Sequence, residues 1–76
     1  MSSKLPVVSG ETLIRALKQL GYEIVRQKGS HVRLYPPADS RRKPTTVPLH
    51  DELAKGTLKA ILRDAGITVE QLLELL

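Results

Sequence analysis

The dipeptide Gly29-Ser30 constrains the fold most, because it separates two runs of strand-forming residues by the two positions that a tight hairpin needs. A type II′ turn requires positive φ at its first central position, which glycine adopts without strain. Side chains alternate along a strand, so the turn also sets the register of the strands on either side. The predicted pairs are Lys28 with His31, Arg26 with Arg33 and Ile24 with Tyr35.

This register divides the hairpin into two faces. We interpret one face as core, and it contains Val25, Gln27, Val32 and Leu34. The other face gathers one imidazole and three cations, namely His31, Arg26, Lys28 and Arg33. Adjacent cations on a sheet repel one another unless an anion is bound there. A polyphosphate chain is such an anion.

Composition limits the remaining possibilities. A chain of 76 residues buries only about 60% of its unfolded surface, which predicts one small domain. Without cysteine, the chain has neither a disulfide framework nor a thiolate metal site. The sequence shows no long apolar run and no signal-type N-terminus, so we expect a cytoplasmic protein without a membrane partner. Twelve basic residues against eight acidic ones give a net charge of +4, which favours nucleic acid as a partner.

Capping and spacing signals predict the helices that cover the sheet. We expect residues 1–8 to form a flexible arm and a first helix to begin at Ser9 and end at Gly21. A second helix ends at Gly66, and a capping box from Thr68 to Gln71 starts a short last helix. The apolar stripes of the three helices are Leu13, Ile14, Leu17 and Leu20; Leu58, Ile61, Leu62 and Ala65; and Val69, Leu72, Leu73 and Leu76.

Strand formers occur at 22–28, 31–35 and 45–47, where Pro48 ends the third strand. Between the last two strands, the proline-bounded segment 36–44 is predicted to project as a loop with a basic tip. The expected fold is α+β: helix, three-stranded antiparallel sheet, helix and short C-terminal helix. We expect all helices to pack on one side of the sheet and its other side to be exposed to solvent.

His31 is the candidate catalytic residue. An isolated histidine is more often a structural or surface residue, but His31 directly follows an exposed turn and has cations on either side. Histidine also changes charge near cellular pH, as a general base requires. The ribose 2′-hydroxyl of RNA lies beside its own phosphate, so a base that removes its proton starts cleavage without a metal ion.

Other groups have supporting or open roles. The Ser30 hydroxyl and the helix entrance at Lys55 are candidate phosphate contacts. The general acid stays open between Lys28, a cycling His31 and water. The spacing of His31 and His50 matches no common metal-ligand pattern, so no metal site is predicted.

Several short motifs, in order and spacing, resemble the HicA toxin family, also called YcfA-like. The motifs are Ser9-Gly10, Leu20-Gly21-Tyr22, the block from Arg26 to Val32, Val47-Pro48-Leu49-His50, Glu52-Leu53, Lys55-Gly56-Thr57-Leu58, Ile61-Leu62 and Ala65-Gly66. The resemblance implies a HicA-like domain over residues 9–76 with a double-stranded-RNA-binding-like fold. It implies the activity of an mRNA interferase, a metal-independent endoribonuclease that acts as the toxin of a toxin-antitoxin system.

The resemblance also implies site residues and partners. The family's catalytic histidine falls on His31, and the usual partner is a HicB antitoxin that covers the active face. A homodimer and a hetero-oligomer with the antitoxin both stay open. The predicted RNA-binding residues are Arg26, Lys28, Gly29, Ser30, Arg33 and Lys55.

Two other functions compete with this one. A noncatalytic RNA-binding module would use the same basic face to recognise an A-form duplex by its shape. A structural adaptor would instead bind another protein through its end at residues 72–76.

Overall fold

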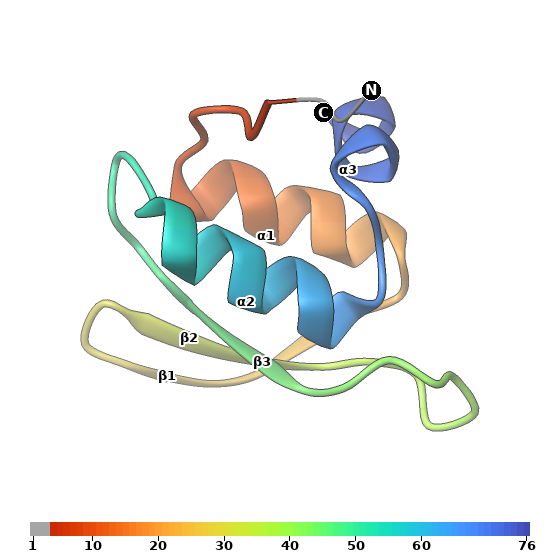
Figure 1. Cartoon of the computed structure of the whole chain (residues 1–76). Helices are drawn as coiled ribbons and strands as arrows, with labels where there is room; N and C mark the ends of the chain where they lie inside the picture. The colour runs from red at the N-terminus through yellow and green to blue at the C-terminus, as the bar shows by residue number, and fades with distance from the viewer. Residues whose placement is uncertain (1–3) are drawn as a thin grey trace.

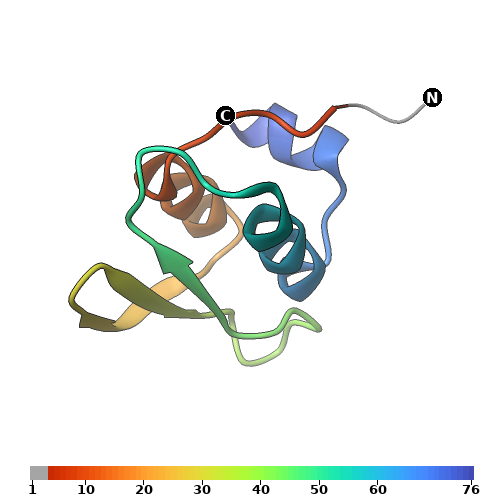
Figure 2. The same ribbon diagram turned by 60° about the vertical axis from the view of Figure 1, so that its left-hand side comes forward.

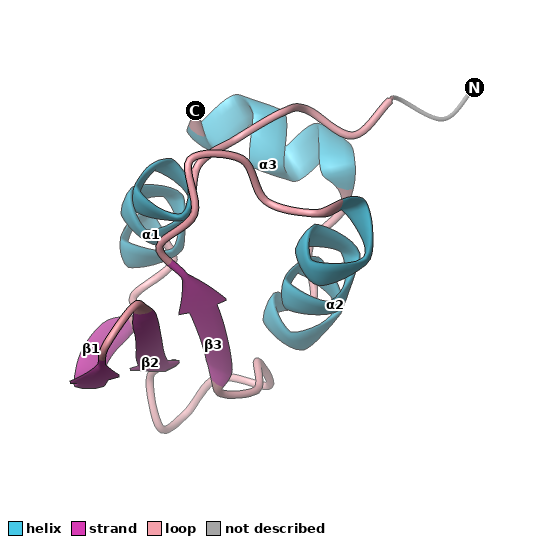
Figure 3. Ribbon diagram, turned by 90° about the vertical axis from the view of Figure 1, so that its left-hand side faces the viewer, coloured by secondary structure: helices cyan, strands magenta, loops and turns pink. Residues whose placement is uncertain are grey.

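Three antiparallel strands form one sheet, and the helices all lie on the same side of it (Figure 1). The computed structural model describes residues 4–76. Its elements are α1 (Gly10–Gln19), β1 (Glu23–Lys28), β2 (His31–Tyr35), β3 (Thr45–Pro48), α2 (Lys55–Ala65) and α3 (Val69–Leu75). Figure 3 shows α1 and α2 above the sheet and α3 lying across both helices. This arrangement confirms the predicted α+β fold.

The ends of the helices follow the predicted capping signals. The Ser9 hydroxyl accepts a hydrogen bond from the Thr12 backbone N–H at 3.1 Å, which starts α1. Gly21 and Gly66 adopt positive φ angles of 95° and 69° beyond α1 and α2. The Thr68 and Gln71 capping box is present at the start of α3. None of the described helices is long and apolar enough to cross a membrane.

The core lies between the sheet and the helices. The predicted stripe of α2 is fully buried, and so is that of α1 except for Leu20, which is half-buried. Val32, Leu34 and Val47 meet these helices from the sheet and are at most 2% exposed. Val8 is also buried, and its carbonyl accepts a hydrogen bond from the Leu53 N–H at 2.9 Å. Residues 1–3 of the predicted arm lie outside the described residues.

The predicted stripe of α3 is partly wrong. Leu72 is fully buried, but Leu73 and Leu76 are 43% and 51% exposed. Val69 and Leu75 pack against the core beside Leu72 instead. A short helix that lies across two others contacts them along one narrow line, so residues at a spacing of three are covered and their neighbours are not.

The register of the hairpin is as predicted near the turn and wrong beyond it. Lys28 pairs with His31 and Arg26 with Arg33, but a β-bulge between Ile24 and Arg26 shifts the remaining pairs. Ile24 therefore pairs with Leu34, and Glu23 takes the predicted place of Ile24 opposite Tyr35. The extra residue of a bulge has no partner of its own on the neighbouring strand.

The predicted core face of β1 is also wrong, because every residue of this strand is exposed. Val25, at the bulge, is 55% exposed. β1 is an edge strand that pairs only with β2, and α1 and α2 pack over β3 at the other edge. The bulge and the charged side chains of β1 limit unwanted pairing along its free edge.

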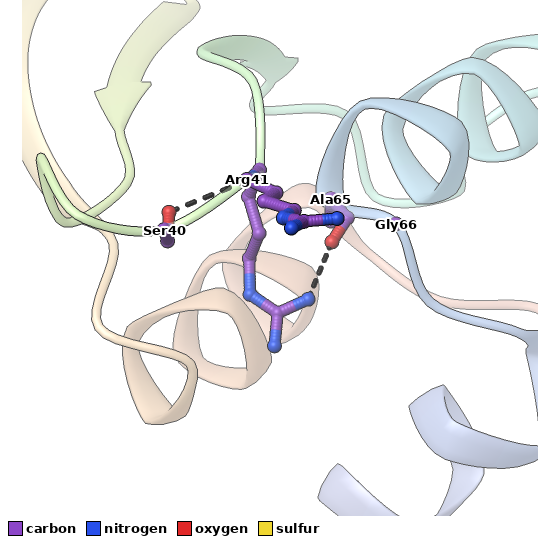
Figure 4. Close-up of a pocket in the computed structure, with 5 residues that line it drawn as sticks. Ser40, Arg41, Ala65 and Gly66 are labelled. Carbon is purple, nitrogen blue, oxygen red and sulfur yellow. Dashed lines mark hydrogen bonds between the residues drawn. The ribbon is translucent and has the colours of Figure 1, made fainter.

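Loop 36–44 was expected to project, but its second half packs against the end of α2 (Figure 2). The Arg42 guanidinium donates a hydrogen bond to the Ala65 carbonyl at 2.6 Å, and the Lys43 N–H donates to the Asp64 carbonyl at 2.8 Å. A helix ends with carbonyl groups that have no partner within the helix, and the loop supplies donors to them. Figure 4 shows the pocket at this junction, lined by Ser40, Arg41, Arg42, Ala65 and Gly66.

Tyr22 joins this loop to the core. Its side chain is 2% exposed, and its hydroxyl donates a hydrogen bond to the Lys43 carbonyl at 2.6 Å. Burial raises the pKa of Tyr22; the Arg42 charge opposes this increase, and the Asp64 charge adds to it. The neutral phenol is therefore the form that the folded protein holds.

We expect Tyr22→Phe to lower the free energy of unfolding by about 1–2 kcal/mol at neutral pH, because the Lys43 carbonyl loses its donor. A folded pKa above the unfolded value of about 10 contributes stability below pH 10 that is lost as the pH rises through the folded pKa. The free energy of unfolding, measured with urea below and above pH 10, should thus fall less with rising pH in the variant than in the wild type. Equal losses would contradict this role of Tyr22.

Candidate functional site

The β1–β2 turn positions the candidate site. Gly29 has a φ of 59°, whereas Ser30 is not among the described residues with positive φ. Positive φ at the first central residue alone is what the predicted type II′ turn requires. The Leu49 N–H donates a hydrogen bond to the Ser30 carbonyl at 2.6 Å. The tip of the hairpin is therefore held against the segment that follows β3.

Four side chains predicted to share a face are brought together by the sheet. Arg26, Lys28, His31 and Arg33, which we call the basic face, line one open depression of about 460 Å³ together with Thr46. This depression lies on the side of the sheet away from the helices, because the neighbouring residues Val32 and Leu34 point into the core. His31 is exposed and accessible to a large ligand.

Arg33 is held in place by two neighbours that sequence reasoning missed. Its guanidinium donates a hydrogen bond to the Thr46 hydroxyl at 3.1 Å and lies 5.5 Å from the centre of the Tyr35 ring. Thr46 pairs with Arg33 across β2 and β3, a register that depends on the long intervening loop. Tyr35 has a sequence signal, because it lies two residues after Arg33 on the same strand.

The other predicted contacts lie outside this depression. Gly29 and Ser30 form the exposed tip of the hairpin, next to Lys28 and His31. Lys55 is exposed at the first residue of α2, in the helix layer, and does not line the depression. The structure therefore brings together the strand residues and not Lys55.

The second histidine has a different setting. His50 is exposed, and its backbone carbonyl accepts a hydrogen bond from the Gly10 N–H at 2.9 Å. Within residues 4–76, no group of three or more His, Cys, Asp or Glu side chains is placed to hold a metal ion.

The basic face has two chemical capacities. A neutral imidazole accepts a proton, and the three adjacent cations stabilise negative charge that develops beside it. An open depression on a sheet also admits a polymer, whereas a closed pocket would admit only a small molecule.

The sequence matches the family model described as the HicA toxin of bacterial toxin-antitoxin systems over residues 10–67. The chain belongs to the HicA toxin family. The matched region runs from the first residue of α1 to just beyond α2 and includes the whole basic face. No individual curated protein matches the chain. As a HicA toxin, the protein has a role within a toxin-antitoxin system, whose second component is an antitoxin.

Proposed function

We propose that this HicA toxin is a metal-independent endoribonuclease that cuts mRNA through the domain at residues 9–76, with His31 as the general base. The observation that supports this proposal most is the placement of an exposed imidazole in one depression with three cations. Phosphate groups supply the negative charge that such a cluster needs.

The proposed reaction needs only the substrate's own nucleophile. His31 removes the proton of a ribose 2′-hydroxyl, and the oxygen attacks the adjacent phosphorus. The bond from phosphorus to the 5′-oxygen then breaks, which leaves a 2′,3′-cyclic phosphate on one product and a 5′-hydroxyl on the other. The departing oxygen takes a proton from Lys28, from protonated His31 or from water. Arg26, Lys28 and Arg33 stabilise the charge on the phosphate oxygens.

Contacts with the RNA backbone extend beyond the depression in this proposal. Ser30 and the Gly29 backbone at the hairpin tip lie beside the depression and are within the region that a bound strand would cross. Lys55, at the start of α2, would bind a more distant phosphate.

The antitoxin partner is proposed to be a HicB-type protein that covers the basic face. An acidic surface would complement the positive charges there and exclude RNA by occupying the same depression. Because the proposed substrate is mRNA, the toxin would act in the cytoplasm.

The test of this function is the chemistry of the products. Purified toxin incubated with mRNA in excess EDTA should yield fragments with 2′,3′-cyclic phosphate and 5′-hydroxyl ends. RNA that is bound and not cut would favour the noncatalytic RNA-binding module and contradict the enzyme. Cleavage that stops in EDTA would contradict the metal-independent reaction.

A further inference from the structure

Tyr35 is an exposed aromatic residue next to the basic face. The chain contains two tyrosines and neither phenylalanine nor tryptophan. Tyr22 is 2% exposed and belongs to the core, whereas Tyr35 is 48% exposed at the end of β2. Its ring is not part of the core cluster, so it is free to contact a ligand on the exposed side of the sheet.

The ring lies in line with His31. Both residues are on β2, four positions apart, which places them on the same face of the sheet at a separation of about 13 Å. Arg33 lies between them, and its guanidinium is 5.5 Å from the centre of the Tyr35 ring. The hydrogen bond from Arg33 to Thr46 holds the guanidinium in this position.

The bulge in β1 lies beside the ring, because its residue Val25 lines the same depression as Tyr35. Val25 and Tyr35 line a second open depression of about 280 Å³, together with Pro36 and Pro37. Glu23 also lines it, and a carboxylate repels phosphate. The depression therefore suits an uncharged planar group. Such a group could belong to a polyanion whose charged part is held by the neighbouring cations of the basic face.

We infer that Tyr35 is a stacking platform for a nucleobase of the bound RNA, roughly one or two nucleotides from the phosphate at His31. This inference rests on the proposed function, because it takes RNA as the ligand of the same face. Aromatic side chains and guanidinium planes are the groups on which proteins stack unpaired bases. Arg33 serves both parts of the site, since it contacts the ring and lines the basic depression.

The experiment measures the affinity of short single-stranded RNA in a His31→Ala background, which keeps the probe intact. Tyr35→Ala should weaken binding roughly 5- to 100-fold. Tyr35→Phe, which keeps the ring, should bind within about threefold of the parent. A matched RNA without bases should bind the parent and Tyr35→Ala equally, because stacking needs a base. Melting temperatures of all variants establish that each is folded.

Three results would overturn the inference. The first is unchanged RNA affinity in Tyr35→Ala, the second is an equal loss of affinity for the RNA that has no bases, and the third is a loss of affinity in Tyr35→Phe as large as that in Tyr35→Ala. Failure of the proposed function is distinguishable from these results. If the wild type binds RNA without cutting it and Tyr35→Ala still weakens binding, the enzyme is contradicted and the stacking platform stands.

Discussion

His31→Ala is expected to reduce the single-turnover rate of RNA cleavage by about 10²- to 10⁴-fold, because the ribose hydroxyl loses its general base. Affinity for the same RNA should change only a few-fold, since the three cations of the basic face remain in place. The variant should fold as the wild type does, because the His31 side chain is exposed and fills no part of the core. The measurement compares cleavage by both proteins at saturating concentration.

His50→Ala is the matched control. It removes the other histidine, which is also exposed and lies outside the depression. Cleavage by His50→Ala should equal that of the wild type. If His31→Ala cleaves RNA at the wild-type rate, this residue is not the general base. If His50→Ala loses as much activity as His31→Ala, the loss does not report on a specific role of His31.

Gly10→Ala is expected to destabilise the protein. A Cβ atom at Gly10 would overlap the Pro48 carbonyl oxygen, a backbone atom that side-chain rotation cannot move away. The N–H of Gly10 also donates to the His50 carbonyl at 2.9 Å, which fixes the start of α1 against the segment that follows β3. Overpacking of this kind costs about 1–3 kcal/mol. Thermal unfolding should show a melting temperature lower by roughly 4–20 °C.

Gly56→Ala provides the comparison for this effect. Gly56 is also in the first turn of a helix, but a Cβ atom there meets nothing within 4 Å. Because alanine loses less backbone entropy on folding, this variant should be more stable by about 0.5–1 kcal/mol. Similar melting temperatures for the two variants would contradict the close approach of α1 to Pro48.

Features that depend on neighbouring residues were predictable from the sequence. The Gly29-Ser30 turn sets the pairing of Lys28 with His31, which are only three residues apart. The sequence therefore predicted correctly that the side chains of the basic face lie together. The caps at Ser9 and Thr68 also act within one helical turn. Such signals need no knowledge of the rest of the fold.

Features that depend on distant parts of the chain were missed. The bulge near Val25 changes the pairing at the far end of the hairpin, and strict alternation of side chains contains no sign of it. The loop at 36–44 was predicted to project with a basic tip, but its Arg42 donates a hydrogen bond to the Ala65 carbonyl, 23 residues away in the sequence. Thr46 became part of the site through the register of β3, which the turn does not determine.

The central claim is that the RNA is cut by its own ribose 2′-hydroxyl, activated on the basic face. Its most direct test is the rate of cleavage of an RNA in EDTA, compared with a matched RNA that has one 2′-deoxyribose at the cleaved position. We predict that the deoxyribose abolishes cleavage at that position while the two RNAs bind equally. Cleavage of the modified RNA at the same position and rate would contradict the account.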